Sequence, residues 1–422
     1  MYSRAIPRVA SKASRFAQCD AHPQAHVFGK LPSRTWKPIQ QHYSRRCESS
    51  FARQLRENYR RSPIAFPFAA GSVLLLATFA VVYIPWYYRN VILKPYHRFP
   101  EPVAKKLRRA MFYSSGKNLD MMEANKYFRQ ALTVSQEIGM DQFSDEILGV
   151  KLLVSHLYEN CGHYSLAAEV MEIMRADLKR WMDEFGDKHW TDGDRTRIMI
   201  RRIELDVKLG QLYDLPYLNE PDNAEKVLTE AVTIALQEQA RRQDEGAKEG
   251  EGDWLSNEQM GGTLEALGQH FEQFDAHYLA TPLFLQALAL CPPNSCHGVV
   301  LMNNVSTCLA QQTAPPASSR SSSPNSFPNL PPVSRDVLVD QAREWAQKAL
   351  DRAATIAPPD RDEECDIACA TATHNLAEFL EMQGRVGDAW RKYKEAESLA
   401  KAIGFSEGVA NAREGQKRLR EK

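Results

Sequence analysis

The sequence lacks the short motifs that mark many nucleotide-binding and hydrolytic active sites. It has no phosphate-binding loop, no HExxH motif, no Gly-x-Ser-x-Gly nucleophile turn and no dinucleotide-binding glycine pattern. Its histidines are scattered over separate segments, among them His156, His163, His270 and His277. We therefore expect a protein that is not an enzyme and that uses no cofactor.

Paired CxxC motifs are also missing, although the chain has 8 cysteines. Structural zinc sites are commonly built from such pairs. Cys291, Cys296 and His297 lie close in sequence, and Cys365 lies one helical turn from Cys369, but neither group has that spacing. We expect no metal and interpret these cysteines as small buried helix residues. Oxidation of Cys365 with Cys369 is the alternative, and it requires close Cβ atoms.

Acidic residues are scarce at the start of the chain. Residues 1–61 hold thirteen Lys or Arg against three acids, with many Ser and Ala. That composition is typical of a mitochondrial presequence. A basic tail that binds anionic lipid is the alternative interpretation of this segment.

Charge is absent altogether from residues 62–88. The centre of this stretch consists of Val, Leu, Ala and Phe, and about 20 apolar residues span a bilayer core. Tyr83, Trp86, Tyr87 and Tyr88 follow, where an interfacial aromatic belt is expected. We predict one transmembrane helix over residues 62–88. A buried helix of the soluble domain is the alternative, and the lack of a polar face argues against it.

The flanking basic residues do not decide the orientation of this helix, because six lie in residues 42–61 and six in residues 89–108. A presequence is drawn into the matrix, so it orients the chain instead. We expect a single-pass protein of the mitochondrial inner membrane, with its N-terminus in the matrix and its C-terminal domain in the intermembrane space.

The two parts of the chain carry opposite charge. The whole chain has 53 basic and 53 acidic residues, but residues 1–109 carry a net charge of +16 and residues 110–422 a net charge of −16. Nucleic-acid binding needs clustered Lys and Arg, so the acidic C-terminal part argues against it. Basic or unfolded polypeptide partners are compatible with this charge.

Residues 264–292 have the pattern of two packed helices. The small residues Gly268 and Ala280 let the helices approach closely, and Pro292 ends the second helix. The apolar, small and aromatic residues follow the offsets of a tetratricopeptide repeat (TPR), which this segment resembles: Leu264, Leu267, Gly268, Phe271, Ala280, Phe284, Ala287 and Pro292.

The same offsets recur along the chain. A single hairpin cannot bury its own apolar stripe, so we predict an all-α fold: a solenoid of about six degenerate TPR-like repeats over residues 103–422, behind one N-terminal transmembrane helix. Insertions near residues 241–253, charged and Gly-rich, and 312–334, rich in Pro and Ser, are predicted to be a solvated linker and a disordered loop. The further copies include Leu376, Ala377, Leu380, Gly384, Ala389, Tyr393 and Ala396; Val154, Ser155, Tyr158, Gly162, Ala167, Met171 and Met174; Ala124, Phe128 and Ala131; Ala224, Leu228 and Ala231; and Asn304, Val305 and Leu309 with Ala342, Ala346 and Ala349.

The first helices of TPR hairpins line a concave groove, so binding residues are expected on them outside the core stripe. A solvated helix face is the alternative. A clamp for a C-terminal carboxylate needs Lys, Arg and Asn at these offsets, and this chain has mostly Glu, Gln and His there, so we expect a groove for extended basic or apolar peptides. The candidates are Leu152, His156, Glu159, Glu265, Gln269, Glu272, Asn303, Thr307, His374, Glu378 and Glu381.

In its order of parts, residues 1–422 resemble the fungal TPR subunit of the mitochondrial i-AAA protease supercomplex: a presequence-like head, one membrane helix and an array of degenerate TPRs. The resemblance implies an adaptor without chemistry of its own, which binds unfolded or misfolded polypeptides for quality control. It also implies contact with an ATP-dependent zinc protease and its associated membrane subunits. The alternative is a TPR receptor or assembly factor of a mitochondrial membrane complex, acting in import or respiratory-chain assembly.

Overall fold

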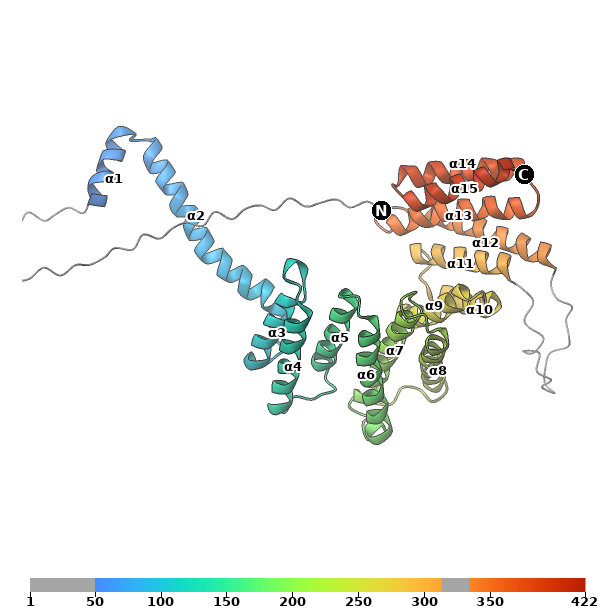
Figure 1. The fold of residues 1–422 in the computed structure, drawn as a ribbon, viewed down its shortest axis with the longest axis horizontal. Coiled ribbons are helices and arrows are strands. Elements are labelled where there is room, and N and C mark those ends of the chain that lie inside the picture. The colour runs from blue at the N-terminus through green and yellow to red at the C-terminus, as the bar shows by residue number, and fades with distance from the viewer. Residues whose placement is uncertain (1–49, 313–333, 422) are drawn as a thin grey trace, which may run out of the picture. The chain divides into compact units, whose positions relative to one another are not determined.

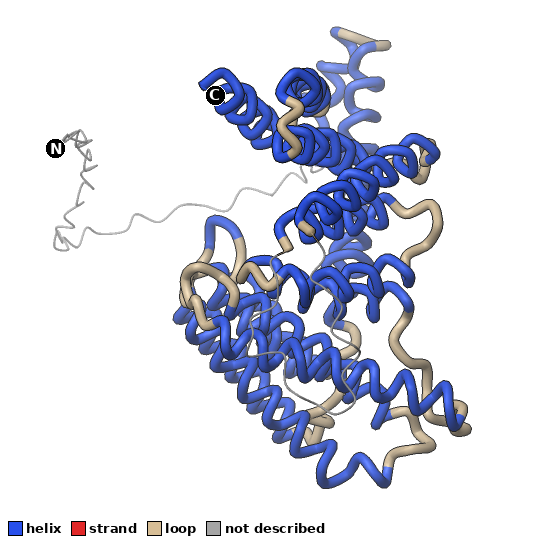
Figure 2. Tube along the Cα trace, turned by 90° about the vertical axis from the view of Figure 1, so that its right-hand side faces the viewer, coloured by secondary structure: helices blue, strands red, loops and turns tan. Residues whose placement is uncertain are grey.

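The structure is a computed structural model that describes residues 50–312 and 334–421. The predicted presequence up to residue 49, and residues 313–333 of the Pro- and Ser-rich insertion, lie outside the described residues. The chain divides into two units, residues 1–86 and 87–422. Every regular element of the described ranges is a helix, as Figure 2 shows.

The described part of the first unit consists of α1 (Ser50–Arg61) and nearly all of α2 (Ala65–Tyr87). With the helical turn that follows, α2 forms one apolar helix, Ala65–Ile92, which has no buried side chain and contains an 18-residue stretch with a mean hydropathy of 2.1. Its Ser72 and Thr78 hydroxyls donate hydrogen bonds to carbonyls one turn earlier in the same helix, which satisfies these polar groups without water. By length and composition this helix can cross a membrane.

The described part of the second unit has six consecutive pairs of α-helices, short helical turns, and a final helix, α15 (Ser406–Glu421), which the repeat pattern does not predict (Figure 1). Each helix packs on the next one in the chain. The predicted all-α, TPR-like fold is confirmed. The first helices of the pairs are α3 (Glu101–Tyr113), α5 (Asp145–Asn160), α7 (Asp194–Tyr213), α9 (Asn257–Gln273), α11 (Cys296–Gln311) and α13 (Glu363–Met382). The second helices are α4 (Met121–Glu137), α6 (Tyr164–Phe185), α8 (Pro221–Glu245), α10 (His277–Leu290), α12 (Arg335–Thr355) and α14 (Val386–Ala402).

Small residues in the core of each pair let its two helices pack closely. At the crossing of α9 and α10, a Cβ on Gly268 would lie 2.9 Å from Cε1 of Phe284, so the helices pack at a distance that only glycine permits there. In every second helix the three predicted core positions are at most 3% exposed: Ala124, Phe128, Ala131; Ala167, Met171, Met174; Ala224, Leu228, Ala231; Ala280, Phe284, Ala287; Ala342, Ala346, Ala349; and Ala389, Tyr393, Ala396.

Short polar side chains fix where several helices begin. Each accepts a hydrogen bond from a backbone N–H of the first turn, which otherwise has no partner in the helix. In α9 the N-cap serine and Gln259 bond each other's backbone and form a capping box. The capping residues are Asp120, Ser144, Ser256, Ser334 and Asp362.

The predicted solvated linker over residues 241–253 begins within a helix. Helix α8 continues to Glu245, and most residues of the loop that follows are exposed. Glu251 is 1% exposed and pairs with Arg241 and Arg242, which both also bind Glu238. The segment is therefore exposed along most of its length, and its buried carboxylate is neutralised by the two arginines.

Candidate binding surface on the first helices

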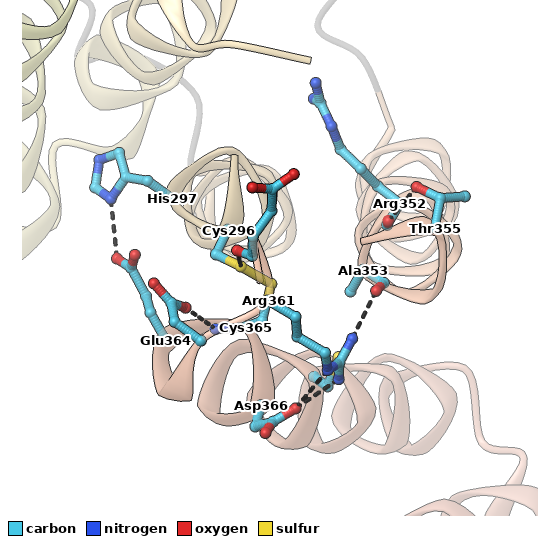
Figure 3. Close-up of a disulfide and its surroundings, with 12 residues drawn as sticks. Cys296, His297, Arg352, Ala353, Thr355, Arg361, Glu364, Cys365 and Asp366 are labelled. Carbon is cyan, nitrogen blue, oxygen red and sulfur yellow. Dashed lines mark hydrogen bonds and ion pairs between the residues drawn. A yellow bond between two sulfur atoms is a disulfide. The ribbon is translucent and has the colours of Figure 1, made fainter. Parts of the chain in front are cut away.

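The predicted groove residues lie on α5, α9, α11 and α13, and several of them join one first helix to the next. His297 of α11 lies between two carboxylates: its Nε2 is 2.7 Å from Oε2 of Glu265 on α9, and its Nδ1 is 3.0 Å from Oε1 of Glu364 on α13 (Figure 3). Gln269 donates to the other oxygen of Glu265. The hydrogen bond to Glu265, and then that to Glu364, raise the pKa of His297 to about 9. Glu265, which is 8% exposed, therefore has a cationic partner at neutral pH.

Two other predicted groove residues also hold α11 against α13. The Nδ2 of Asn303, a buried residue, donates to the carbonyl of Ala368 at 2.9 Å. The hydroxyl oxygen of Thr307 accepts a hydrogen bond from Asn375 at 3.3 Å. Both residues therefore form hydrogen bonds between successive repeats.

Glu272 on α9 is half-buried, and its carboxyl lies near the thiol of Cys308 on α11. Burial raises the pKa of the Glu272 carboxyl. It also raises the pKa of the Cys308 thiol, which is completely buried. This pair is a further link between first helices, and its location gives Glu272 little exposed charge.

At the C-terminal end, α15 covers the predicted acidic groove of α13. Arg418 lies 2.8 Å from Oε2 of Glu381 and 3.7 Å from Oε1 of Glu378. The Tyr393 hydroxyl donates to Glu381 at 2.9 Å. His374 lies 3.5 Å from Glu378. These three predicted residues thus have partners within the chain, and the sequence pattern missed the helix that supplies Arg418.

The predicted residues of α5 have a different environment. His156 is exposed, and Leu152 is 39% exposed. Glu159 binds Lys208 of α7 at 3.0 Å. Next to them, α5 and α7 border a hollow of 320 Å³ that includes Leu152 and Lys208. The offsets within the repeat do not predict the contribution of α7, although Gly149 in the first half of α5 interrupts the row of larger side chains there.

A disulfide joins Cys296 at the start of α11 to Cys365 in α13, with the two Cα atoms 4.8 Å apart (Figure 3). Cys369 is a free thiol. The alternative of a bond between Cys365 and Cys369 is therefore wrong. Residues four apart on one helix have Cβ atoms about 5–6 Å apart, beyond the roughly 3.5–4.5 Å that a disulfide requires.

One further group of potential metal ligands lies in the turn before α7, where the ligand atoms of His189, Asp192 and Asp194 are within 4.8 Å of one another. The group is satisfied internally. His189 Nδ1 is hydrogen-bonded to Asp192, and Arg197 lies 2.9 Å from Asp194. These contacts explain why the three side chains lie close together, and no bound ion is needed to hold them there.

The sequence was compared with known proteins. No family model matches it. It is 27% identical to a TPR repeat-containing protein of Schizosaccharomyces pombe over 312 residues, 74% of this chain and 76% of that protein. It is also 27% identical to Protein MRG3-like of Saccharomyces cerevisiae, over 155 residues, 36% of this chain and 31% of that protein.

Among solved structures, BtubC from P. vanneervenii matches 72% of this chain and 91% of its own length, with 12% identity and a TM-score of 0.42. The helix pairs and their small-residue cores have the TPR-like pattern. The chain thus has a TPR-like fold and is similar in sequence to a TPR repeat-containing protein of fission yeast.

Proposed function

We propose that this protein is a membrane-anchored, non-catalytic adaptor that binds unfolded polypeptides and delivers them to the mitochondrial i-AAA protease for quality-control degradation. The observation that carries the proposal is the union, in one chain, of an apolar helix without a buried side chain, Ala65–Ile92, and a TPR array. The helix would anchor the array beside a membrane-bound protease, and the first helices would bind the client.

The proposed location is the inner membrane, with the N-terminus in the matrix and the TPR array in the intermembrane space. The disulfide between Cys296 and Cys365 supports a compartment that permits oxidation, because disulfides are rare where thiols are kept reduced. The basic composition of residues 1–61 supports import into mitochondria.

The proposed clients are unfolded chains with exposed apolar and basic segments. The net charge of −16 on residues 110–422 supports attraction of basic segments at long range. At short range the acidic residues of the first helices attract basic segments less strongly, because Glu265 and Glu381 already have cationic partners. Apolar contact is therefore expected to contribute most of the specificity.

Topology can be tested by adding protease to intact mitochondria and to mitochondria with a ruptured outer membrane. The proposal requires digestion of the TPR array only after rupture. Digestion in intact organelles would instead support a receptor on the outer membrane.

Client delivery can be tested by following an unfolded reporter in mitochondria with and without the chain. We expect slower degradation of the reporter when the chain is absent. We also expect the reporter to co-purify with the chain, without ATP, when the protease is catalytically inactive. An unchanged reporter half-life together with absent co-purification would refute the adaptor role.

A further inference from the structure

The hollow between α5 and α7 has an apolar floor. Its 320 Å³ lies at the lower end of the range for ligand pockets, roughly 300–1,000 Å³. Side chains from three helices, α5, α6 and α7, make the floor, and each is at most 4% exposed: Leu148, Met174, Leu178 and Leu205. An apolar group that reaches this floor would therefore leave water and contact apolar side chains.

One wall of the hollow is open because α5 has a glycine there. A Cβ added to Gly149 would meet no heavy atom within 4 Å. Glycine in a helix is less favourable than alanine, and packing within the fold does not require it here. The open space beside Gly149 and the half-exposed Leu152 together give access to the floor.

The charges at the rim of the hollow are paired with each other. Arg201 lies 2.9 Å from Asp145 and 2.6 Å from Glu204. Lys208 lies 3.0 Å from Glu159. The hydrogen bonds from Arg201 hold the pKa of Asp145 below its usual value, so this pair stays ionised at neutral pH. A charged ligand would have to separate one of these pairs, whereas an apolar side chain would not.

We propose that this α5–α7 hollow binds one large apolar side chain, aromatic or leucine, of an unfolded polypeptide segment. The inference rests on the proposed function and specifies the chemistry that the surface selects. The paired rim and the apolar floor argue for this occupant over a basic side chain. The volume of the hollow is large enough for one side chain. Among its described lining residues, every charged side chain has a partner of opposite charge.

The test uses the full chain in lipid nanodiscs and a fluorescent, unstructured peptide that contains one Phe, compared with the same peptide carrying Ser instead. Burying a Phe side chain corresponds to about tenfold or more in affinity. We expect the Phe peptide to bind at least about tenfold more tightly than the Ser peptide. Raising the salt from about 0.1 M to about 1 M, which shortens the screening length from about 10 to about 3 Å, should leave this ratio unchanged.

Gly149→Leu places a side chain in the hollow, and Gly262→Leu is the matched control. Gly262 is an exposed glycine in the middle of α9, and an added Cβ there also meets nothing within 4 Å. We expect Gly149→Leu to remove the preference for Phe without lowering the thermal midpoint, and Gly262→Leu to keep the preference.

The outcomes separate the two proposals. If the wild-type chain prefers the Phe peptide and Gly149→Leu retains that preference, the hollow is not the site, although client binding stands. A preference that follows Lys or Arg in the peptide, and that disappears in high salt, also overturns the hollow as the site. If neither peptide nor a denatured protein binds the wild-type chain, both this inference and the adaptor role are wrong.

Discussion

The interface of α5 with α7 and the interface of α11 with α13 occupy equivalent places in the repeat array, yet they are built differently. Between α11 and α13 there are a disulfide and the buried amide of Asn303. Between α5 and α7 there are ion pairs at the rim of an apolar hollow. The role of a polar residue at a groove position therefore depends on which side chain of the next first helix lies opposite it.

The two interfaces also differ in how easily they can admit a ligand. Exposed ion pairs contribute about 0–1 kcal/mol each, so the rim of the α5–α7 hollow can rearrange at small cost. A disulfide and a buried hydrogen bond are much harder to open. We infer that the N-terminal half of the array provides the adaptable surface and the C-terminal half a rigid frame.

The largest effect is expected from removing the disulfide. Cys296 and Cys365 are 69 residues apart in sequence, and closing a loop of that length constrains the unfolded chain by about 4 kcal/mol in the chain-entropy model. Cys365→Ser should therefore speed amide hydrogen exchange in α11 and α13 and leave α5 and α7 unchanged. Cys369→Ser removes a free thiol nearby and serves as the control. Equal acceleration in both halves would show that the C-terminal half is not a separate frame.

A smaller effect is expected at the hairpin between the two interfaces. Gly268→Leu forces a side chain against the Phe284 ring, where even a Cβ would lie at 2.9 Å. Overpacking of this kind costs about 1–3 kcal/mol. Thermal unfolding of the full chain should begin at a lower temperature, whereas Gly262→Leu on the exposed side of α9 should behave as the wild type. An unchanged midpoint would mean that α9 and α10 do not pack at this glycine.

A third effect is a dependence on pH that only the C-terminal interface should show. The pKa of His297 in the folded protein, about 9, lies above the unfolded value of 6.5. Its pairing therefore stabilises the fold fully below about pH 6.5 and is lost as the pH rises through 9. Because the side chain is 40% exposed, we reduce the expected effect for solvent screening to about 1 kcal/mol.

The measurement is the difference in urea stability between the wild type and His297→Gln, followed from pH 6 to pH 10 (roughly one unit beyond the raised pKa). The difference should shrink toward high pH. At the α5–α7 interface the corresponding cation is Arg201, and its partners raise its pKa further. The contribution of that interface to stability should therefore stay constant over the same pH range. A difference that grows with pH would contradict the role given to His297.

The parts of this fold that the sequence predicted are those determined within a helix or within one hairpin. The spacing of Ala280, Phe284 and Ala287 identifies a packed face because helical periodicity alone brings these residues together. The apolar helix near the N-terminus was predicted from the length of an uncharged stretch, which is likewise a property of one segment. Helix α15 was missed because it completes no hairpin of its own.

The roles of the groove residues depend on partners far away in sequence. Glu265 meets His297, and Cys296 meets Cys365, only when successive repeats stack. Offsets within a repeat identify which residues face the next first helix. They do not identify the partner side chain on that next helix. The groove positions could therefore be predicted, but their partners could not.

The smallest effect tests the open wall of the hollow directly. Gly149→Ala adds a Cβ that meets no heavy atom within 4 Å, and alanine is more favourable than glycine in a helix by about 0.5–1 kcal/mol. The variant should therefore be slightly more stable than the wild type in urea denaturation. Gly210→Ala on α7 is the opposite case, because its Cβ would lie 2.4 Å from Cγ of Leu228, and it should be destabilising. If Gly149→Ala also destabilises the chain, the space beside α5 is occupied in the folded protein. The α5–α7 interface would then not be open, in contradiction to the comparison with the α11–α13 interface.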